Sequence, residues 1–176
     1  YVNVEYEAGF AYADDRVATA RPSELGPDDL LGRAVGVAHR GAVGLGLDVQ
    51  VERLEPGHRV PVDLVGNMAS YTWGMAVHGM VAVPVTVEKG ERVELVMRNT
   101  TMMAHPMHMH GPSFQVTEIN GQAFAGAVRD VVLVPPRTTV KVVFDADNPG
   151  LWAYHSHTLY HMTAGMFATV VYRGFN

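Results

Sequence analysis

The sequence contains no cysteine among its 176 residues. No disulfide can therefore staple the fold, and no thiolate of this chain can bind a metal ion. The absence does not decide the compartment, because an oxidising space also suits a protein that needs no disulfide. With 48% hydrophobic residues, the chain can still build a proper core.

Two further features are missing, a basic excess and a long apolar run. The net charge is −5 with both signs scattered, which argues against a nucleic-acid partner. No apolar run approaches the roughly 20 residues that span a bilayer, and no signal-peptide layout is present. The chain begins at Tyr1, so we expect a processed, partial or trimmed product.

Turn residues divide most of the chain into short segments of alternating apolar and polar residues, the pattern of strands buried on one face. Residues 1–46 are weakly patterned, with one weak strand near the start, and are interpreted as an N-terminal extension or interdomain linker, followed by one domain over 47–176. Short strands with turn signals roughly every eight to twelve residues indicate an all-β fold, a Greek-key sandwich or barrel. Pro84 predicts a sheet edge or a strand start. The predicted strands are 47–54, 59–65, 73–77, 81–87, 92–97, 114–119, 131–134, 138–144 and 166–172, with others in two histidine-rich windows.

Six of the nine histidines lie in those windows, residues 105–114 and 152–166. Neutral imidazole is the commonest metal ligand, so such clustering indicates metal. On a strand, residues two apart share a face, which places His108 with His110 and His155 with His157. Ser156 then faces the other way. Two metal positions back to back on one strand are predicted.

A change of period follows the second pair. Residues 158–162 read as one short helical turn, which returns His161 towards the side of Ser156. Gly165 permits a tight bend, and Met166 follows it as a candidate thioether ligand.

These residues resemble the C-terminal cupredoxin domain of multicopper oxidases. That family carries H-P-x-H-x-H-G-x-x-F and H-C-H-x-x-x-H-x-x-x-x-M, and both spacings occur here, starting at His105 and His155. The surrounding residues, such as Gly66-Asn67-Met68 and 101–105, look most like the bacterial copper-resistance branch. The resemblance covers about residues 64–172 and implies a cupredoxin fold and copper as the cofactor.

The resemblance also implies a role for each ligand. His105, His161 and Met166 would hold the type 1 copper, where Ser156 replaces the family's cysteine. The other positions supply half of the oxygen-reducing cluster, with His108 for type 2 copper and His110, His155 and His157 for the type 3 pair. An N-terminal cupredoxin domain or subunit would contribute the other two H-x-H pairs.

Serine changes the expected chemistry, because its hydroxyl is a hard, weak ligand that forms no alkoxide at neutral pH. We expect no blue, electron-transferring copper and no oxidase activity from this chain alone. In the full assembly, the resemblance implies one-electron oxidation of cuprous ion or phenols coupled to reduction of O2 to water, in the periplasm or outside the cell. Two alternatives stay open, a redox-silent protein that sequesters copper in copper resistance and a structural module with relic ligands.

Other residues are read more simply. His39 and His58 are predicted in solvent-facing loops, and His78 in a structural or surface position. Trp73 and Trp152 are predicted in the core, and Asp130 either beside a ligand histidine or in a surface ion pair. A group of methionines is interpreted mainly as core filler, with a soft pool for copper(I) as the alternative. This group comprises Met102, Met103, Met107, Met109 and Met162.

Overall fold

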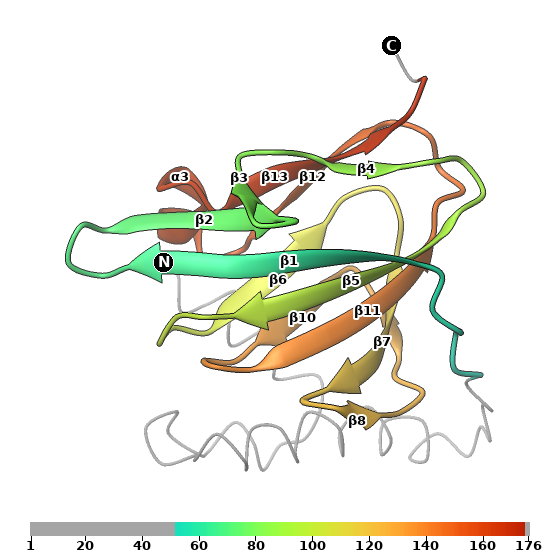
Figure 1. Ribbon diagram of the computed structural model, residues 1–176, viewed down its shortest axis with the longest axis horizontal. Coiled ribbons are helices and arrows are strands. Elements are labelled where there is room, and N and C mark those ends of the chain that lie inside the picture. The colour runs from blue at the N-terminus through green and yellow to red at the C-terminus, as the bar shows by residue number, and fades with distance from the viewer. Residues whose placement is uncertain (1–51, 175–176) are drawn as a thin grey trace. The chain divides into compact units, whose positions relative to one another are not determined.

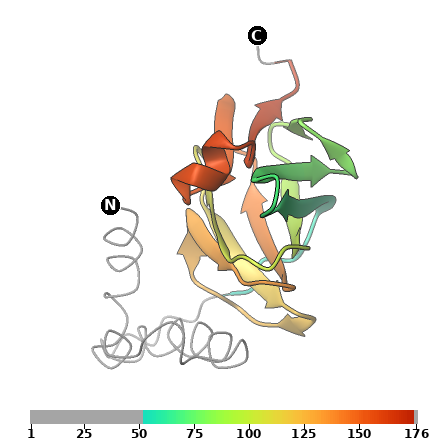
Figure 2. The same ribbon diagram turned by 90° about the vertical axis from the view of Figure 1, so that its left-hand side faces the viewer.

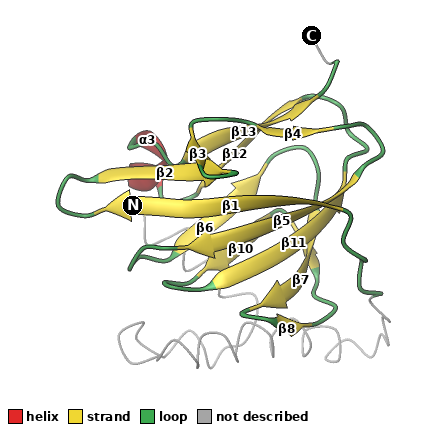
Figure 3. Cartoon of the chain, viewed as in Figure 1, coloured by secondary structure: helices red, strands yellow, loops and turns green. Residues whose placement is uncertain are grey.

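A computed structural model describes residues 52–174, the greater part of a compact unit that comprises Glu52–Asn176. The predicted extension over residues 1–46, with His39, lies outside the described residues. Within them, almost all regular structure is strand, with one short helix (Figure 3). The all-β prediction is confirmed. The strands are β1 (His58–Asn67), β2 (Thr72–Val77), β3 (Met80–Val81), β4 (Val85–Val87), β5 (Arg92–Asn99), β6 (His105–Met109), β7 (Phe114–Ile119), β8 (Gln122–Ala123), β9 (Val128–Arg129), β10 (Val131–Val134), β11 (Thr139–Asp145), β12 (Leu151–Ser156) and β13 (Phe167–Tyr172), and the helix is α3 (Leu159–Thr163).

The strands form two sheets (Figure 1). One has the order β3-β2-β1-β5-β11-β7-β8, with β9 also paired to β7, and the other has the order β10-β6-β12-β13-β4. Consecutive strands from β4 to β7, and again from β10 to β12, alternate between the sheets. This crossing places β6 and β12, which carry the histidine windows, side by side at the middle of the second sheet.

The core lies between the sheets and follows the predicted alternation. On β1, the side chains of Val60, Val62 and Leu64 are buried, while the intervening residues face outward. Equivalent positions on the other long strands add mostly valine, methionine and aromatic side chains. Such β-branched and aromatic residues pack well on a pleated surface, which is why the period-2 pattern located these strands.

Several predicted bounds were wrong. Glu52–Leu54, the described part of the predicted strand 47–54, is not strand, although Leu54 N–H donates to the Gln115 side chain at 2.7 Å. The predicted strand 81–87 is interrupted before β4. Pro84 directly precedes β4, an edge strand, as expected for a residue without an N–H donor.

Two of the additional short strands, β3 and β8, belong to tight hairpins. His78 and Gly79, with φ of 49° and 80°, connect β2 to β3, and Asn120 and Gly121, with φ of 47° and 84°, connect β7 to β8. Two successive positive φ values define the type I′ turn that suits a two-residue hairpin. Strands of two residues are too short to produce an alternating pattern, so periodicity missed them.

The helix α3 lies where the helical turn was predicted. It packs against β12, which precedes it, and against β2 of the other sheet (Figure 2). Backbone hydrogen bonds fasten its C-terminal side, because Trp73 N–H donates to Ala164 O at 3.1 Å. The only buried residue of α3 is His161, so this short helix places one histidine inside the sandwich.

Candidate metal centre

Pairing between β6 and β12 separates the predicted ligands into two groups. His155 lies opposite His108, and Ser156 lies opposite Met107. Because opposite residues of an antiparallel pair project to the same face, His108 and His155 share one face of this two-strand ribbon. Ser156 and His105 belong to the other face. The structure therefore has the back-to-back arrangement that strand geometry predicted.

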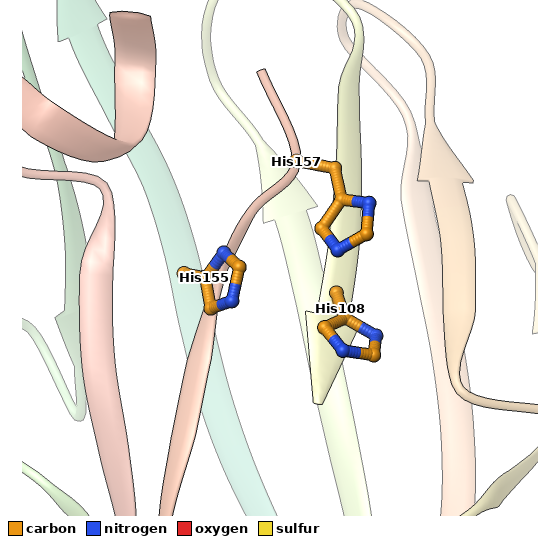
Figure 4. Close-up of side chains that lie close together, drawn as sticks. All are labelled: His108, His155 and His157. Atoms are coloured by element: carbon orange, nitrogen blue, oxygen red, sulfur yellow. The ribbon is translucent and has the colours of Figure 1, made fainter. Parts of the chain in front are cut away.

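Four histidines form the outer cluster, defined as His108, His110, His155 and His157. Ligand atoms of His108, His155 and His157 all lie within 4.8 Å of one another, and Figure 4 shows their three rings gathered together. The fourth member, His110, contacts this group through its Nε2, which lies 3.2 Å from the Nε2 of His155. His110 and His157 lie just beyond their strands, and their backbone N–H groups still donate across the ribbon, to Ala153 O and Pro106 O.

Backbone carbonyls orient two rings of the outer cluster. His108 Nδ1 lies 2.9 Å from Asp130 O, and His155 Nδ1 lies 3.1 Å from Ser156 O. A carbonyl only accepts, so the neutral rings carry their proton on Nδ1 and keep a lone pair on Nε2. Asp130 thus acts mainly through its backbone, since its carboxylate is 3.9 Å from the His108 ring. Phe167 also stacks beside His155, with ring centroids 5.9 Å apart.

The opposite face carries the inner site, defined as His105, Ser156, His161 and Met166. All four are buried, with exposed fractions of 0 to 3%. The Nδ1 atoms of His105 and His161 lie 3.2 Å apart. Two residues separated by 56 positions therefore direct the same ring atom at each other inside the core.

The chain after α3 brings Met166 to the inner site. Met166 N–H donates to His161 O at 2.9 Å, and Ser156 N–H donates to Met166 O at 3.1 Å. The bend requires Gly165, whose φ is +115° and whose Cβ position would lie 2.4 Å from Trp73 O. The Ser156 hydroxyl accepts the N–H of Thr158, the residue that precedes α3, at 3.2 Å.

An indole covers the inner site, a contact that sequence patterns did not indicate. Trp73 stacks on His161 with ring centroids 4.0 Å apart and packs edge-on against His105 at 5.4 Å. Its Nε1 is buried and has no hydrogen-bond partner among residues 52–174. Trp73 lies on β2, about ninety positions before His161, so no local motif could have linked the two.

Burial keeps these imidazoles neutral. Burial, followed by the nearby charge of His161, lowers the pKa of His105 to about 4. Burial also lowers the pKa of His161. For His155, burial lowers the pKa, the Ser156 carbonyl opposes that effect, and the charges of His108 and His110 add to it. Neutral rings at pH 7 are the form that binds metal.

The donor sets suit copper or zinc better than a hard cation. Ring nitrogens bind these ions at about 2.0 Å, so two ligands of one ion lie at most about 4 Å apart. The 3.2 Å separations of His105 from His161 and of His110 from His155 satisfy this limit. The spread of 4.8 Å among His108, His155 and His157 is wider and suits a cluster of ions sharing these ligands.

The remaining predicted residues separate into core and surface. Met107 and Met109 are core residues, as expected, whereas Met102 and Met103 are exposed and Met162 is half-buried. Trp73 is in the core, and Trp152 is partly buried and packs against the core. His78 is exposed in its turn, and His58 is exposed but begins β1 and pairs with Glu91 at 2.7 Å. His58 was expected in a loop.

Sequence comparison connects this geometry to known proteins. The family model for multicopper oxidases matches residues 53–174, which is nearly the whole described unit. The chain belongs to the multicopper oxidase family. It is a copper-binding domain of that family with a cupredoxin-like fold, as the resemblance implied.

Two relatives place it within the family. The chain is 42% identical over 123 residues to multicopper oxidase MmcO of Mycobacterium tuberculosis, a match that covers 68% of this chain and 24% of that protein. It is 38% identical over 117 residues to copper resistance protein A of Escherichia coli, covering 66% and 19% respectively. The chain thus spans about a quarter or less of these relatives, and it falls in the bacterial copper-resistance branch.

Solved structures agree on the fold. The blue copper oxidase of Nitrosomonas europaea superposes with a TM-score of 0.59 at 21% identity, covering 66% of this chain and 44% of that one. No helix among residues 52–174 is both long and apolar enough to cross a membrane.

Proposed function

We propose that this chain is the C-terminal-type copper-binding domain of a larger oxidase. That assembly couples one-electron oxidation of cuprous ion or a phenolic substrate to reduction of O2 to water. The observation that carries the proposal is the pair of histidine groups on opposite faces of β6 and β12, joined through the consecutive residues 155–157. An oxidase of this kind needs one site for electron entry and another for oxygen reduction, with ligands on adjacent residues of the chain.

Each group would hold copper in a different role. His105, His161 and Met166 would bind an ion at the inner site, where two imidazoles and a thioether favour Cu(I) and Cu(II). In the outer cluster, His108 would serve a type 2 ion, and His110, His155 and His157 a type 3 pair. Copper held there supplies one-electron redox chemistry and oxygen binding. The chain's own contribution is to hold neutral rings in fixed tautomers, through the carbonyls of Asp130 and Ser156.

Ser156 disables electron entry in this chain. A type 1 site needs a thiolate between its two imidazoles, and position 156 supplies a hydroxyl in a fully buried place. Without a thiolate, the link between the inner site and the rings of His155 and His157 lacks its strongly coupled sulfur. The domain would bind copper without blue colour, and the chain alone would be inactive as an oxidase.

The outer cluster also calls for a partner. His110 and His157 are exposed, and the described residues contribute four histidines to this cluster. An N-terminal cupredoxin domain or subunit with two H-x-H pairs would complete the coordination from the opposite side. The similarity of this chain to copper resistance proteins suggests that the assembly lies in the periplasm or outside the cell.

A second function is favoured by Ser156 itself. A domain that binds copper without passing electrons would sequester it, and the exposed thioethers of Met102 and Met103 would add soft ligands. The two functions differ in their requirement for a partner. A co-purifying or genetically linked domain with two H-x-H pairs, restoring oxygen consumption in the Ser156→Cys background, supports the oxidase. Copper binding that needs no such domain, with no oxygen consumption in its presence, supports sequestration.

The decisive experiment replaces Ser156 with cysteine. Position 156 lies opposite Met107 on the face of the inner site, and the Thr158 N–H already points at its side-chain oxygen. Ser156→Cys with copper(II) should therefore produce an intense blue thiolate charge-transfer band. Visible absorption and electron paramagnetic resonance measure it.

The matched control is Ser156→Ala, which removes the hydroxyl without adding sulfur and should stay colourless with copper(II). A folded Ser156→Cys protein that binds copper but gives no such band would refute the assignment of His105, His161 and Met166 as partners of position 156.

A further inference from the structure

A buried hydrogen-bond network leads to the inner site from the end of β5. Asn99 is 1% exposed, and its Nδ2 lies 2.7, 3.0 and 2.9 Å from the carbonyl oxygens of Met103, Val134 and Pro135. Three carbonyls can only accept, so the amide nitrogen must face them. The orientation of the Asn99 side chain is thereby determined, with Oδ1 directed at Thr101.

The hydroxyl of Thr101 stands between that amide and an imidazole. Its Oγ1 lies 2.8 Å from Asn99 Oδ1 and 2.8 Å from His105 Nε2, and it accepts the N–H of Met103 at 3.1 Å. A hydroxyl has one proton to donate. Asn99 Oδ1 cannot donate, so the Thr101 hydroxyl is the donor in their 2.8 Å contact. The Met103 carbonyl is a more distant acceptor, at 3.2 Å.

Counting the available protons then identifies the donor in the contact between Thr101 Oγ1 and His105 Nε2. Asn99 Oδ1 already accepts the backbone N–H of Thr101 at 2.9 Å. If the Thr101 hydroxyl donated to His105 Nε2 instead, two acceptor oxygens would face each other 2.8 Å apart in a buried place, which is a repulsive contact. If His105 Nε2 carries the proton, the Thr101 hydroxyl donates to Asn99 Oδ1 and accepts from His105 Nε2 and from the Met103 N–H, so each of these three contacts has one donor and one acceptor. A neutral imidazole has one proton, so Nδ1 is left with its lone pair directed at His161.

We propose that Asn99 and Thr101 are positioning residues that hold His105 in the Nε2–H tautomer, with Nδ1 ready to bind the inner-site metal. The metal-binding part of this inference rests on the proposed function, whereas the tautomer does not. Neither residue belongs to the histidine motifs.

The network selects the opposite tautomer from the one in the outer cluster. There, backbone carbonyls hold His108 and His155 with the proton on Nδ1. At the inner site, a threonine hydroxyl holds the proton on Nε2. The two opposite faces of the β6–β12 ribbon therefore present different ring nitrogens. On each face, the hydrogen-bond partner determines whether Nδ1 or Nε2 keeps the lone pair. Partners of this kind typically change metal affinity about 10- to 100-fold when removed.

The first test is the tautomer of His105 in the metal-free full chain at pH 7.5, from long-range ¹H–¹⁵N correlation spectra. We expect the Nε2–H pattern in the wild type. Thr101→Ser retains the hydroxyl and should give the same pattern. Thr101→Val is close to threonine in shape but cannot accept the proton, so the ring should change to the Nδ1–H form or to a mixture. A wild-type Nδ1–H pattern, or an unchanged pattern in Thr101→Val, overturns the inference.

The second test measures copper(II) affinity at the inner site by competition with a chelator, with His108, His155 and His157 replaced by glutamine to silence the outer cluster. Thr101→Val should weaken binding by about 10- to 100-fold, and Thr101→Ser by much less. Equal affinity for wild type and Thr101→Val overturns the positioning role. If the inner site binds no copper while His105 shows the expected tautomer, the tautomer assignment stands and the proposed function fails, so the two failures are distinct. The wild-type spectrum decides the tautomer even if Thr101→Val does not fold.

Discussion

At the scale of single residues, Gly165 shows how a position without chemistry of its own can control a site. Its positive φ turns the chain between His161 and Met166, and its hydrogen atom faces the Trp73 carbonyl where a methyl group would not fit. The requirement is therefore both conformational and steric. Glycine is the only residue that meets it, because any side chain would collide with backbone.

Replacing this glycine should be costly. We expect Gly165→Ala to destabilise the protein by at least about 2 kcal/mol, since it combines strained backbone with a clash at 2.4 Å. Gly79→Ala is the matched control, with positive φ but nothing within 4 Å of the added Cβ, and should cost only about 1 kcal/mol. Urea unfolding measures both. Equal losses for the two variants would show that the contact with Trp73 O does not matter.

At the scale of elements, β1 and β5 are linked by two ion pairs that look alike in sequence but differ in burial. Arg59 lies opposite Glu94, and Arg98 lies opposite Asp63, in the same parallel register. Both arginines are about 60% exposed. The carboxylates differ, because Glu94 is 2% exposed and Asp63 is 26% exposed.

This difference predicts unequal costs for the same mutation. Arg59→Ala leaves a buried carboxylate without its partner and should destabilise the protein by about 2 kcal/mol or more. Arg98→Ala removes a solvent-screened pair and should cost less than about 1 kcal/mol. Denaturant unfolding compares the two variants. A double variant Arg59→Ala with Glu94→Gln should recover part of the loss, and the absence of any recovery would argue that the arginine stem, not its charge, stabilises the strand pair.

At the scale of the whole molecule, two groups of histidines gather around the paired strands β6 and β12. Burying several imidazoles there has an energetic consequence, because the pKa values of His105, His155 and His161 are all lowered, with burial as the largest cause. Between the lowered value in the folded protein and the ordinary value near 6.5, the unfolded chain binds more protons. Stability therefore rises with pH in that interval.

The pH profile of the metal-free protein should reflect this. The contribution of His105 is fully present above about pH 6.5 and is lost as the pH falls towards about 4, the pKa of His105 in the folded state. Urea midpoints measured from pH 7.5 to 4 should therefore decrease. A His105→Asn variant should decrease less over that range, which separates the histidine from carboxylates. Parallel profiles for the two proteins would contradict the lowered pKa.

Much of this arrangement could be predicted because its signals are local. Alternation located the longer strands, and H-x-H spacing on a strand implied that His155 and His157 would lie on the face opposite to Ser156. What alternation could not locate were the two-residue strands, the interruption before Pro84, and the contacts made by Trp73 and Thr101, since these depend on chain segments that meet only after folding.

The sequence by itself determined the donor atoms, their spacing, the family and the absence of a thiolate, because these are properties of residue identity and order. Only the tertiary structure decided which ring nitrogens face each other. It also decided which rings burial keeps neutral and which neighbours hold their protons. Those properties arise from hydrogen bonds and desolvation between strands far apart in the chain, and no local pattern carries them.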